Sequence, residues 1–226
     1  MTPLLEVFTV PPFGENTYLV GDADTGEAIV IDPGGRVDDI LTVAAAAGLK
    51  ITQVVNTHAH VDHVLGVAAL CKATGAPFWL HRDAAPMAAQ VGESAEQYGL
   101  PPAEQPVVDG FLVPGENVTV GNLVLEVRYT PGHAPGHVTL FANDAQMGDA
   151  RAPIAFVGDV IFLGGIGRTD LAGGNFETLM ASIENEILTM PDETVLYSGH
   201  GPATTVGHER HFNPFVTEWR AARGTP

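Results

Sequence analysis

The stretch ITQVVNTHAHVDHVLG, residues 51–66, carries the strongest structural signal in the chain. It begins with the apolar, β-branched run of a buried strand. His58, His60 and Asp62 then alternate, and His63 follows where a helical pattern begins. Imidazole and carboxylate ligands suit zinc, iron or manganese, and the lack of a thiolate disfavours a purely structural zinc site. We interpret the loop as part of a metal site; the alternative is a polar turn in which Asp62 caps the helix.

Strand-like and helix-like segments follow each other in groups on both sides of this loop. Strands are expected at 5–10, 17–20, 27–32, 51–56, 77–81, 123–130, 137–141, 154–162 and 193–199. Helices are expected at 37–48, 64–75, 82–99, 176–190 and 208–220. This order predicts an α/β fold, a four-layer αββα sandwich in which two mixed β-sheets face each other with helices outside. No repeat or linker divides the 226 residues, so a single domain over residues 1–226 is expected.

Two of the expected helices contain residues with a predicted structural role. Asn175 is the expected N-cap of the helix that starts at 176. In the last helix, we expect Phe212, Phe215 and Trp219 to pack into the core. The alternative is that these three rings form part of a substrate mouth or a subunit contact.

Charge and cysteine content limit the function classes. The formal charge is −17 and the ten Lys and Arg are scattered, which disfavours binding to nucleic acid or to an anionic membrane. Cys71 is the only cysteine, so there is no internal disulfide and no Cys-rich zinc module, and a reducing compartment is expected. No apolar run approaches the roughly 18 residues of a membrane span, and the N-terminus lacks a basic signal region. We therefore predict a cytoplasmic protein that is a monomer or a small homo-oligomer and acts on a small molecule.

Further metal ligands have to come from other parts of the chain, because four residues in one loop do not complete two coordination spheres. Three stretches offer them where expected strands end: TPGHAPGH (130–137), FVGD (156–159) and YSGHG (197–201). In each, Gly beside the polar residue permits a tight turn and a close backbone approach. Catalytic groups are often placed in such loops at the rim of a sheet.

Taken in order, IDPG (31–34), THAHVDH (57–63), TPGH (130–133), Gly158-Asp159 and Gly199-His200 resemble the metallo-β-lactamase superfamily of dinuclear metallohydrolases over nearly the whole chain. The resemblance implies two divalent ions, zinc first and iron or manganese as alternatives. It assigns His58, His60 and His133 to one ion, Asp62, His63 and His200 to the other, and Asp159 as the bridge. Seven ligands for two ions leave room for a shared water, which Asp62 and Asp159 are expected to orient as catalytic residues.

Two more residues are expected to support the ligands. PGH occurs twice, at 131–133 and 135–137, and the superfamily places its ligand at the first, His133. His137 is then expected to hydrogen-bond a ligand or the backbone. Asp32 resembles the buried aspartate that orients the metal loop in the superfamily, the alternative being a turn residue before Pro33.

Within the superfamily, IGRTDLAGGN (166–175) and SGHGPATTVGHERHFNPF (198–215) resemble glyoxalase II, or hydroxyacylglutathione hydrolase, in its short bacterial form. That resemblance implies hydrolysis of S-D-lactoylglutathione or a related thioester by a hydroxide held between the ions. A thiol of pKa near 8.5 leaves as thiolate with little acid assistance. Longer forms have a C-terminal helical domain for glutathione, and this chain stops before one. Arg168 is the candidate to bind a substrate carboxylate, the alternative being an ion pair with Asp170.

Two other functions remain open at this point. Persulfide dioxygenases share THxHxDH and GRTD but use one iron; they typically have Cys in place of His137 and lack the GHGP found at 199–202. The third reading is a metal-binding protein of this fold without hydrolytic activity. The number of bound ions separates the first two readings, and a complete absence of turnover would favour the third.

Overall fold

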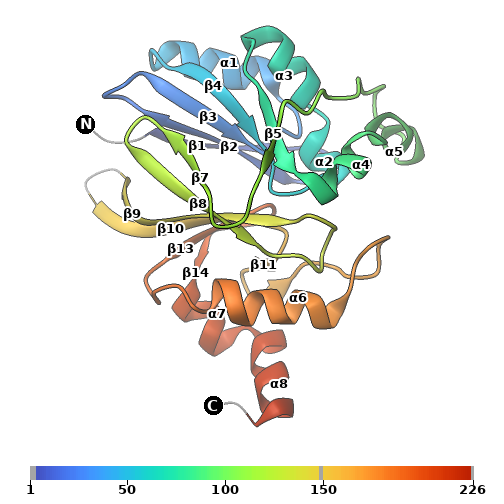
Figure 1. The fold of residues 1–226 in the computed structure, drawn as a ribbon, viewed down its shortest axis with the longest axis vertical. Coiled ribbons are helices and arrows are strands. Elements are labelled where there is room, and N and C mark those ends of the chain that lie inside the picture. The colour runs from blue at the N-terminus through green and yellow to red at the C-terminus, as the bar shows by residue number, and fades with distance from the viewer. Residues whose placement is uncertain (1–3, 148–149, 225–226) are drawn as a thin grey trace.

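Two six-stranded sheets lie face to face in the centre of the computed structural model, which describes residues 4–147 and 150–224 (Figure 1). The N-terminal sheet runs from β1 to β6 in order: Leu4–Val10, Glu15–Asp22, Glu27–Ile31, Lys50–Val55, Phe78–His81 and Gly110–Leu112. The C-terminal sheet has the order β14-β13-β10-β9-β8-β7: Thr204–Thr205, Val195–Ser198, Ala150–Gly158, Val138–Met147, Leu123–Tyr129 and Asn117–Val120. A small hairpin of β11 (Ile161–Phe162) and β12 (Gly165–Ile166) follows β10.

Both large sheets are mixed. In the N-terminal sheet β1, β2 and β3 pair antiparallel, whereas β3 to β6 pair parallel. In the C-terminal sheet β10 and β13 pair parallel and the other neighbours are antiparallel. Parallel neighbours end at the same edge, so β3 and β4 in one sheet, and β10 and β13 in the other, each end side by side.

Helices cover the two outer faces (Figure 1). The N-terminal sheet is covered by α1 (Val37–Ala46), α2 (Val61–Val64), α3 (Val67–Thr74), a 3₁₀ turn (Arg82–Ala84), α4 (Ala85–Ala88) and α5 (Val91–Gln97). The C-terminal sheet is covered by α6 (Phe176–Ser182), a π-helical turn (Ile183–Ile187), α7 (Val206–Phe212) and α8 (Pro214–Arg223). The predicted four-layer αββα sandwich is confirmed. Within the described residues, none of the helices combines the length and apolar character that crossing a membrane would require.

Strand alternation divides the core into three parts. In β3, Ile29 and Ile31 pack between the sheets, while Ala28 and Val30 pack under the N-terminal helices. In β10, too, alternate side chains pack between the sheets, while those between them pack under the C-terminal helices. Side chains that alternate at period 2 fix the register, because a slip of one residue would turn each apolar set to the wrong face. The loops at the sheet edge are therefore attached to a rigid frame.

Several expected elements are interrupted. The expected helix 64–75 is divided at Gly66, where an added Cβ would lie 2.7 Å from the Pro33 carbonyl oxygen. The expected strand 154–162 ends at Gly158, whose φ is +47°. The expected helix 208–220 is broken at Pro214, which lacks the N–H that would continue the first helix. Asn213 caps the second helix by accepting from the N–H of Phe215 at 3.1 Å.

The break changes which aromatic residues are buried. Phe212 is 70% exposed and Phe215 is 41% exposed, so the prediction that they pack into the core is wrong. The new helix starts with a different phase, and it turns Val216 and Trp219 toward the core under the C-terminal sheet. Asn175 accepts from the N–H of Thr178 at 2.9 Å, which confirms it as the N-cap of α6.

Candidate metal centre

The residues singled out in the sequence meet at one edge of the sandwich, where strands of both sheets end. The loop with His58, His60, Asp62 and His63 follows β4; Asp32 follows β3, His133 follows β8, Asp159 follows β10 and His200 follows β13. Asn16 of β2 joins the two sheets here, because its side-chain amide donates to the carbonyl oxygens of Ser198 (3.2 Å) and Gly201 (2.8 Å).

Two groups of three side chains face each other at this edge. Within each group the donor atoms lie within 4.8 Å of one another; the groups are His58, His60 and His133, and Asp62, His63 and His200. Asp159 lies between them. Its Oδ1 is 3.5 Å from His63 Nε2, and its Oδ2 is 3.5 Å from the Nε2 atoms of His133 and His200. The structure therefore brings together all seven residues that the resemblance implied, in the same two groups.

Three atoms of this cluster are buried and have no hydrogen-bond partner among the described residues. They are His58 Nε2, His63 Nε2 and Asp159 Oδ1. Leaving one buried polar group unpaired costs about 1–3 kcal/mol. Three unpaired polar atoms at one point indicate that a bound ligand supplies their missing partner. Imidazole and carboxylate donors in groups of three fit first-row divalent cations, so the residues present fit two metal ions.

Hydrogen bonds behind the cluster fix the tautomers of the rings. His133 Nδ1 donates to the carbonyl oxygen of Arg168 at 2.8 Å. His63 Nδ1 donates to Asp32 Oδ2 at 3.2 Å. A proton held on Nδ1 leaves the Nε2 lone pair directed into the cluster, which is the arrangement a metal ligand needs.

Asp32 links the metal loop to the end of β3. It is buried, and its oxygens accept from the N–H and the hydroxyl of Thr57, both at 2.6 Å. The same hydroxyl lies 3.1 Å from His58 Nδ1 and thereby accepts that ring's proton. Asp32 has φ of +51°, in the left-handed region that Asp tolerates better than most residues. Both of its oxygens are engaged within the protein, so Asp32 supports the loop.

His137 is fully buried next to the cluster, with its ring stacked on that of His58 at 4.9 Å between centroids. Its Nε2 accepts from the backbone N–H of Asp159 at 3.2 Å. Its Nδ1 therefore holds the proton and donates to Thr130 Oγ1 at 3.0 Å. With both nitrogens engaged, His137 has no free lone pair, and it belongs to neither group of ligand atoms.

The three histidines of the first group favour the neutral form. Burial lowers the pKa of His58 well below its usual value and, together with the nearby His133, lowers the pKa of His60 to about 4. Burial also lowers the pKa of His133. Since neutral imidazole is the form that binds a cation, these rings are ready ligands at neutral pH.

In the second group and in Asp159, charged side chains shift the pKa values of their neighbours. Burial would raise the pKa of the Asp159 carboxyl, but His63, His133 and His200 hold it below its usual range. Burial would lower the pKa of His63, yet Asp159 and Asp62 raise it well above its usual value. In the absence of an ion, protons on His63 offset these carboxylates. A divalent cation would replace that positive charge.

Glycine is required where the backbone passes closest to the ligands. A Cβ on Gly199 would lie 2.2 Å from Asp159 Oδ1 and 2.7 Å from the His63 ring. A Cβ on Gly158 would lie 2.4 Å from Thr57 Oγ1, and its φ is positive. These two glycines allow the ends of β10 and β13 to approach the metal loop.

The sequence interpretation missed Glu15, which lies behind His63. Glu15 is fully buried, and its Oε2 accepts from Thr17 Oγ1 at 3.0 Å. Its Oε1 has no hydrogen-bond partner within residues 4–147 and 150–224 and lies 3.9 Å from His63 Nδ1. Burial raises the pKa of this carboxyl well above its ordinary value. The available signal was an acidic residue three positions before the apolar run YLV (18–20) of a buried strand. Thr57 and the Arg168 carbonyl were also missed, the latter because a backbone contact leaves no trace in residue type.

The Arg168 side chain points to Asp170. Its Nε and NH2 donate to the two carboxylate oxygens of Asp170 at 2.8 and 2.7 Å, and the two side chains are 60% and 68% exposed. This is the ion pair that the sequence left as the alternative. The role of Arg168 toward a substrate carboxylate remains a prediction.

Two residues that would serve as nucleophiles in other enzymes are excluded. Cys71 lies partly buried on α3, packed on the core as expected, and burial raises the pKa of its thiol to about 11. Ser198 is fully buried and donates to the carbonyl oxygen of Ile161 at 2.7 Å. Neither presents a reactive group to the cluster.

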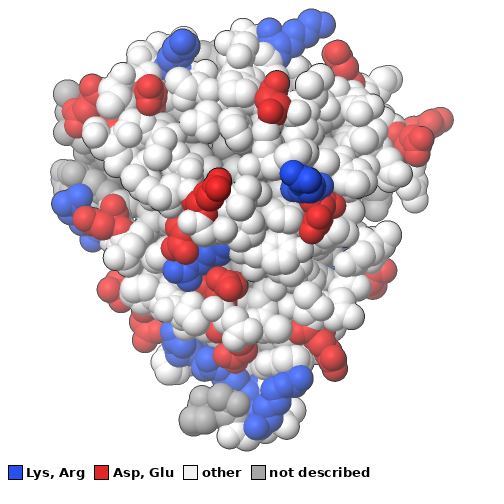
Figure 2. Space-filling model, in the orientation of Figure 1, with Lys and Arg blue, Asp and Glu red and all other residues white. Residues whose placement is uncertain are grey.

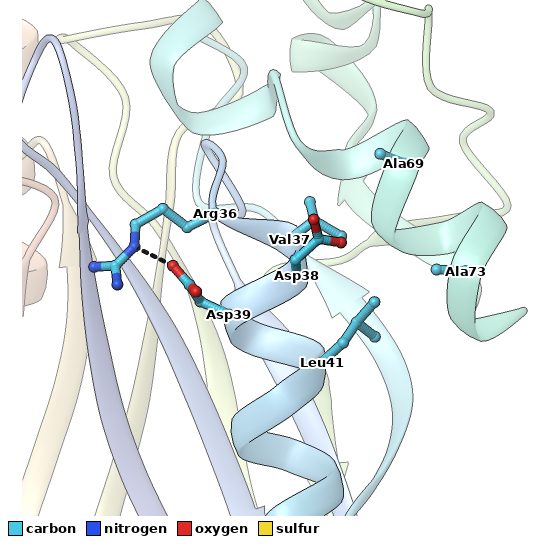
Figure 3. A pocket seen from close by; sticks show the side chains of 7 residues that line it. All are labelled: Arg36, Val37, Asp38, Asp39, Leu41, Ala69 and Ala73. Carbon is cyan, nitrogen blue, oxygen red and sulfur yellow. Dashed lines mark hydrogen bonds and ion pairs between the residues drawn. The ribbon is translucent and has the colours of Figure 1, made fainter.

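A groove of about 580 Å³ lies between α1 and α3 (Figure 3). It is lined by Arg36, Val37, Asp38, Asp39, Leu41, Ala69 and Ala73. Its charged residues include an ion pair between Arg36 Nε and Asp39 Oδ2 at 2.8 Å. None of its lining residues belongs to a metal group or holds a buried unpaired polar atom. The chemistry therefore lies at the sheet edge and not in this groove.

The comparisons with known proteins agree with this geometry. The family model described as the metallo-beta-lactamase superfamily matches residues 10–200. The chain belongs to the metallo-β-lactamase superfamily. One superfamily relative, hydroxyacylglutathione hydrolase GloC of Haemophilus influenzae, is 33% identical over 214 residues, which is 94% of this chain and 97% of the relative.

Two further matches show the range of this superfamily. The mitochondrial persulfide dioxygenase ETHE1 of Bos taurus is 33% identical over 212 residues, covering 89% of this chain and 71% of that protein. The crystal structure of TTHA1623 in a di-iron-bound form matches with a TM-score of 0.80 and 34% identity, covering 93% of this chain and 99% of that one. The relatives thus include a hydrolase and a dioxygenase, and a structural neighbour holds two irons.

Proposed function

We propose that this superfamily member is a metal-dependent hydrolase of glyoxalase II type. It would cleave S-D-lactoylglutathione or a related thioester, with water, into a hydroxy acid and a free thiol. The observation that carries the proposal is the pair of ligand groups joined by Asp159, with unpaired donor atoms directed into the space they surround. The similarity to a hydroxyacylglutathione hydrolase along nearly the full chain supports the same substrate class.

The residues have separate tasks in this proposal. His58, His60 and His133 would hold one ion, Asp62, His63 and His200 the other, and Asp159 both. When bound, the ions would supply Lewis acidity and a water acidic enough to react at neutral pH. Zinc is the ion we propose first, with iron or manganese as alternatives.

The carboxylates are the groups that would orient the attacking water by accepting its hydrogen bonds. The Asp62 side chain is 17% exposed and the Asp159 side chain is 10% exposed, so both are reachable from the open side of the cluster. Attack breaks the bond between the acyl carbon and sulfur; the acid keeps the oxygen of water, and the sulfur leaves as thiolate. Because thiols have a pKa near 8.5, the thiolate needs no dedicated acid.

Persulfide dioxygenation is the second candidate, favoured by the similarity to ETHE1. That reaction uses one iron. The complete second group, with His200 Nε2 3.2 Å from Asp62 Oδ2 and 3.5 Å from Asp159 Oδ2, favours a two-ion hydrolase.

Metal content and turnover measured on one preparation test the choice. Protein reconstituted with zinc or with iron would be assayed with S-D-lactoylglutathione and with glutathione persulfide. We expect two ions per chain, thioester hydrolysis, and no oxygen consumption. His200→Ala should lose one ion and most hydrolysis. One iron per chain with oxygen-dependent persulfide turnover, retained in His200→Ala, would establish the dioxygenase instead.

The surface charge agrees with a small-molecule substrate. On the face shown in Figure 2, most Lys and Arg side chains stand singly among Asp and Glu, and the blue side chains that gather at the lower end lie around α8. Arg220 of α8 is paired with Glu184 at 2.6 Å, and Arg223 lies over the Trp219 ring. Such paired cations do not form the patch that phosphates require. We propose that the protein acts in the cytoplasm and binds neither nucleic acid nor membrane.

A further inference from the structure

Two aromatic side chains from distant parts of the chain meet beside the metal loop. Phe13 lies in the turn between β1 and β2, and Tyr98 directly follows α5. Their rings contact edge to face, with centroids 5.7 Å apart and planes at 89°. Phe13 is 40% exposed and Tyr98 is 51% exposed. An exposed aromatic pair next to ligand residues is a feature that the metal centre does not use.

Phe13 lines a small niche that also includes Asp62, and Tyr98 packs against the Phe13 ring. The niche has about 10 Å³ of free volume and is lined by Val10, Pro11, Pro12, Phe13, Gly34, Asp62, Leu65 and Leu100. A volume of this size is at the lower limit for one water molecule, so only a group of about that size enters. A Cβ on Gly34 would lie 1.9 Å from the Asp62 carbonyl oxygen, so the metal loop lies directly against this wall.

The lining defines what chemical group fits. Apart from Asp62, every lining side chain is apolar, and the niche contains no cation and no side-chain hydrogen-bond donor. A carboxylate placed here would lose its water next to another carboxylate and gain no partner. The group that enters beside Asp62 is therefore small, uncharged and apolar.

Charged side chains lie near Tyr98. The ion pair with Asp170 raises the pKa of the Arg168 guanidinium, and the Tyr98 hydroxyl contributes to the same direction. Arg168 and Asp170 are exposed and lie within electrostatic range of Tyr98, so this side of the aromatic pair offers polar groups. A thioester has the same division, with a short acyl group at one end and a polar thiol at the other.

We propose that the Phe13–Tyr98 pair and its niche select the acyl part of the thioester by size. A methyl-sized substituent, as in acetyl or lactoyl thioesters, fits beside Asp62, whereas longer or aromatic substituents meet the two rings. The inference rests on the proposed thioester hydrolysis and names its specificity. One methylene in a closed apolar pocket changes discrimination by roughly 10–200-fold.

A series of glutathione thioesters that differ only in the acyl group tests this proposal: acetyl, D-lactoyl, butanoyl and phenylacetyl. For the metal-loaded wild type we expect kcat/KM to fall at least about tenfold from acetyl to butanoyl. Phe13→Ala should raise the butanoyl-to-acetyl ratio at least about fivefold. Tyr98→Ala should do the same, and Tyr98→Phe should retain wild-type selectivity because it keeps the ring. Both residues are half-exposed, and metal content verifies that each variant holds its site.

Phe212→Ala is the matched control, since Phe212 is an exposed aromatic residue on α7 and does not line the niche. Phe212→Ala should leave the relative kcat/KM values of the four thioesters unchanged. Equal loss for all four thioesters in Phe13→Ala, or unchanged selectivity in both alanine variants, would overturn the inference while leaving thioester hydrolysis in place. If the metal-loaded wild type hydrolyses no member of the series, the proposed function fails and the inference fails with it.

Discussion

Asp159 and Glu209 are both buried acids in the C-terminal half of the chain, but their surroundings differ. Glu209 Oε1 accepts from Thr204 Oγ1 at 2.5 Å, and its Oε2 accepts from the Gly164 N–H at 3.0 Å and the Asn213 side chain at 2.8 Å. Among the residues that the structure describes, none donates a hydrogen bond to Asp159 Oδ1.

The difference shows that burial alone does not mark a functional acid. Burying a carboxylate costs free energy unless hydrogen bonds or counter-charges offset it. The protein supplies the full set to Glu209, which ties the β11–β12 hairpin to α7 and α8. For Asp159 the set of hydrogen bonds is incomplete, which leaves Oδ1 available to a ligand from outside the chain.

Replacing Asp159 gives the largest expected effect on function. Asp159→Ala should reduce bound metal from two ions to one or none and lower kcat/KM by more than the roughly 100-fold that losing an outer partner of a ligand costs. Metal analysis of the purified variant and thioester kinetics measure both. Two ions retained per chain would remove Asp159 from the ligand set and end the contrast with Glu209.

Replacing Glu209 should affect stability and spare the metals. Glu209→Ala leaves the Asn213 amide and the Gly164 N–H without their acceptor, so we expect the free energy of unfolding to fall by about 3 kcal/mol. Denaturant unfolding measures this, with Glu218→Ala on the exposed side of α8 as the control. Loss of metal from a variant that unfolds like the wild type would show that the two acids are not separate in role.

Asp22 is a third acid, and its carboxylate, like that of Glu209, accepts hydrogen bonds from within the protein. The N–H of Asn122 at 2.7 Å lowers the pKa of Asp22, with further donation from the Asn122 side chain and the Asp24 N–H. Because its pKa is lower in the folded chain, Asp22 stabilises the fold fully above its unfolded value of about 4, and this contribution is lost as pH falls through the folded value. Asp22→Ala should cost about 1 kcal/mol at pH 7.

Unfolding curves of Asp22→Ala and the wild type at pH 7 and below pH 3 measure this contribution. The difference between them should shrink in acid, whereas Glu104→Ala should match the wild type at both values. A difference that is constant with pH would mean that the Asp22 charge is not what stabilises the turn.

Arg168 should give the smallest effect. Its guanidinium is exposed and already paired with Asp170, so Arg168→Ala should raise KM for glutathione thioesters about threefold and leave small neutral thioesters unchanged. The substitution keeps the backbone carbonyl that accepts from His133, so metal content should stay at the wild-type value. Asp170→Asn, which frees the guanidinium, should lower KM for the same substrates. Equal effects on charged and neutral thioesters would leave Arg168 as a turn residue.

Much of the fold could be predicted because periodicity is local. The continuous apolar run in 27–31 indicates a strand that is buried on both faces, and the alternation in 123–129 indicates a strand with one buried face. The structure contains these strands as β3 and β8. The short strands β6 and β7 were not predicted, because three or four residues give little periodic signal. The breaks at Gly66 and Pro214 were missed because apolar spacing continues across them.

The sequence by itself determined which donor types the site has, since His58, His60, Asp62 and His63 lie within six positions and the other three ligands follow in recognisable motifs. Only the tertiary structure decided which atoms are left unpaired. Whether the Nε2 of His133 or that of His137 points at the other candidate ligands depends on partners 35 and 22 residues away, namely the carbonyl of Arg168 and the N–H of Asp159. The physical reason is that these hydrogen bonds join segments far apart in the sequence that only the folded chain brings together, and residue type does not encode them.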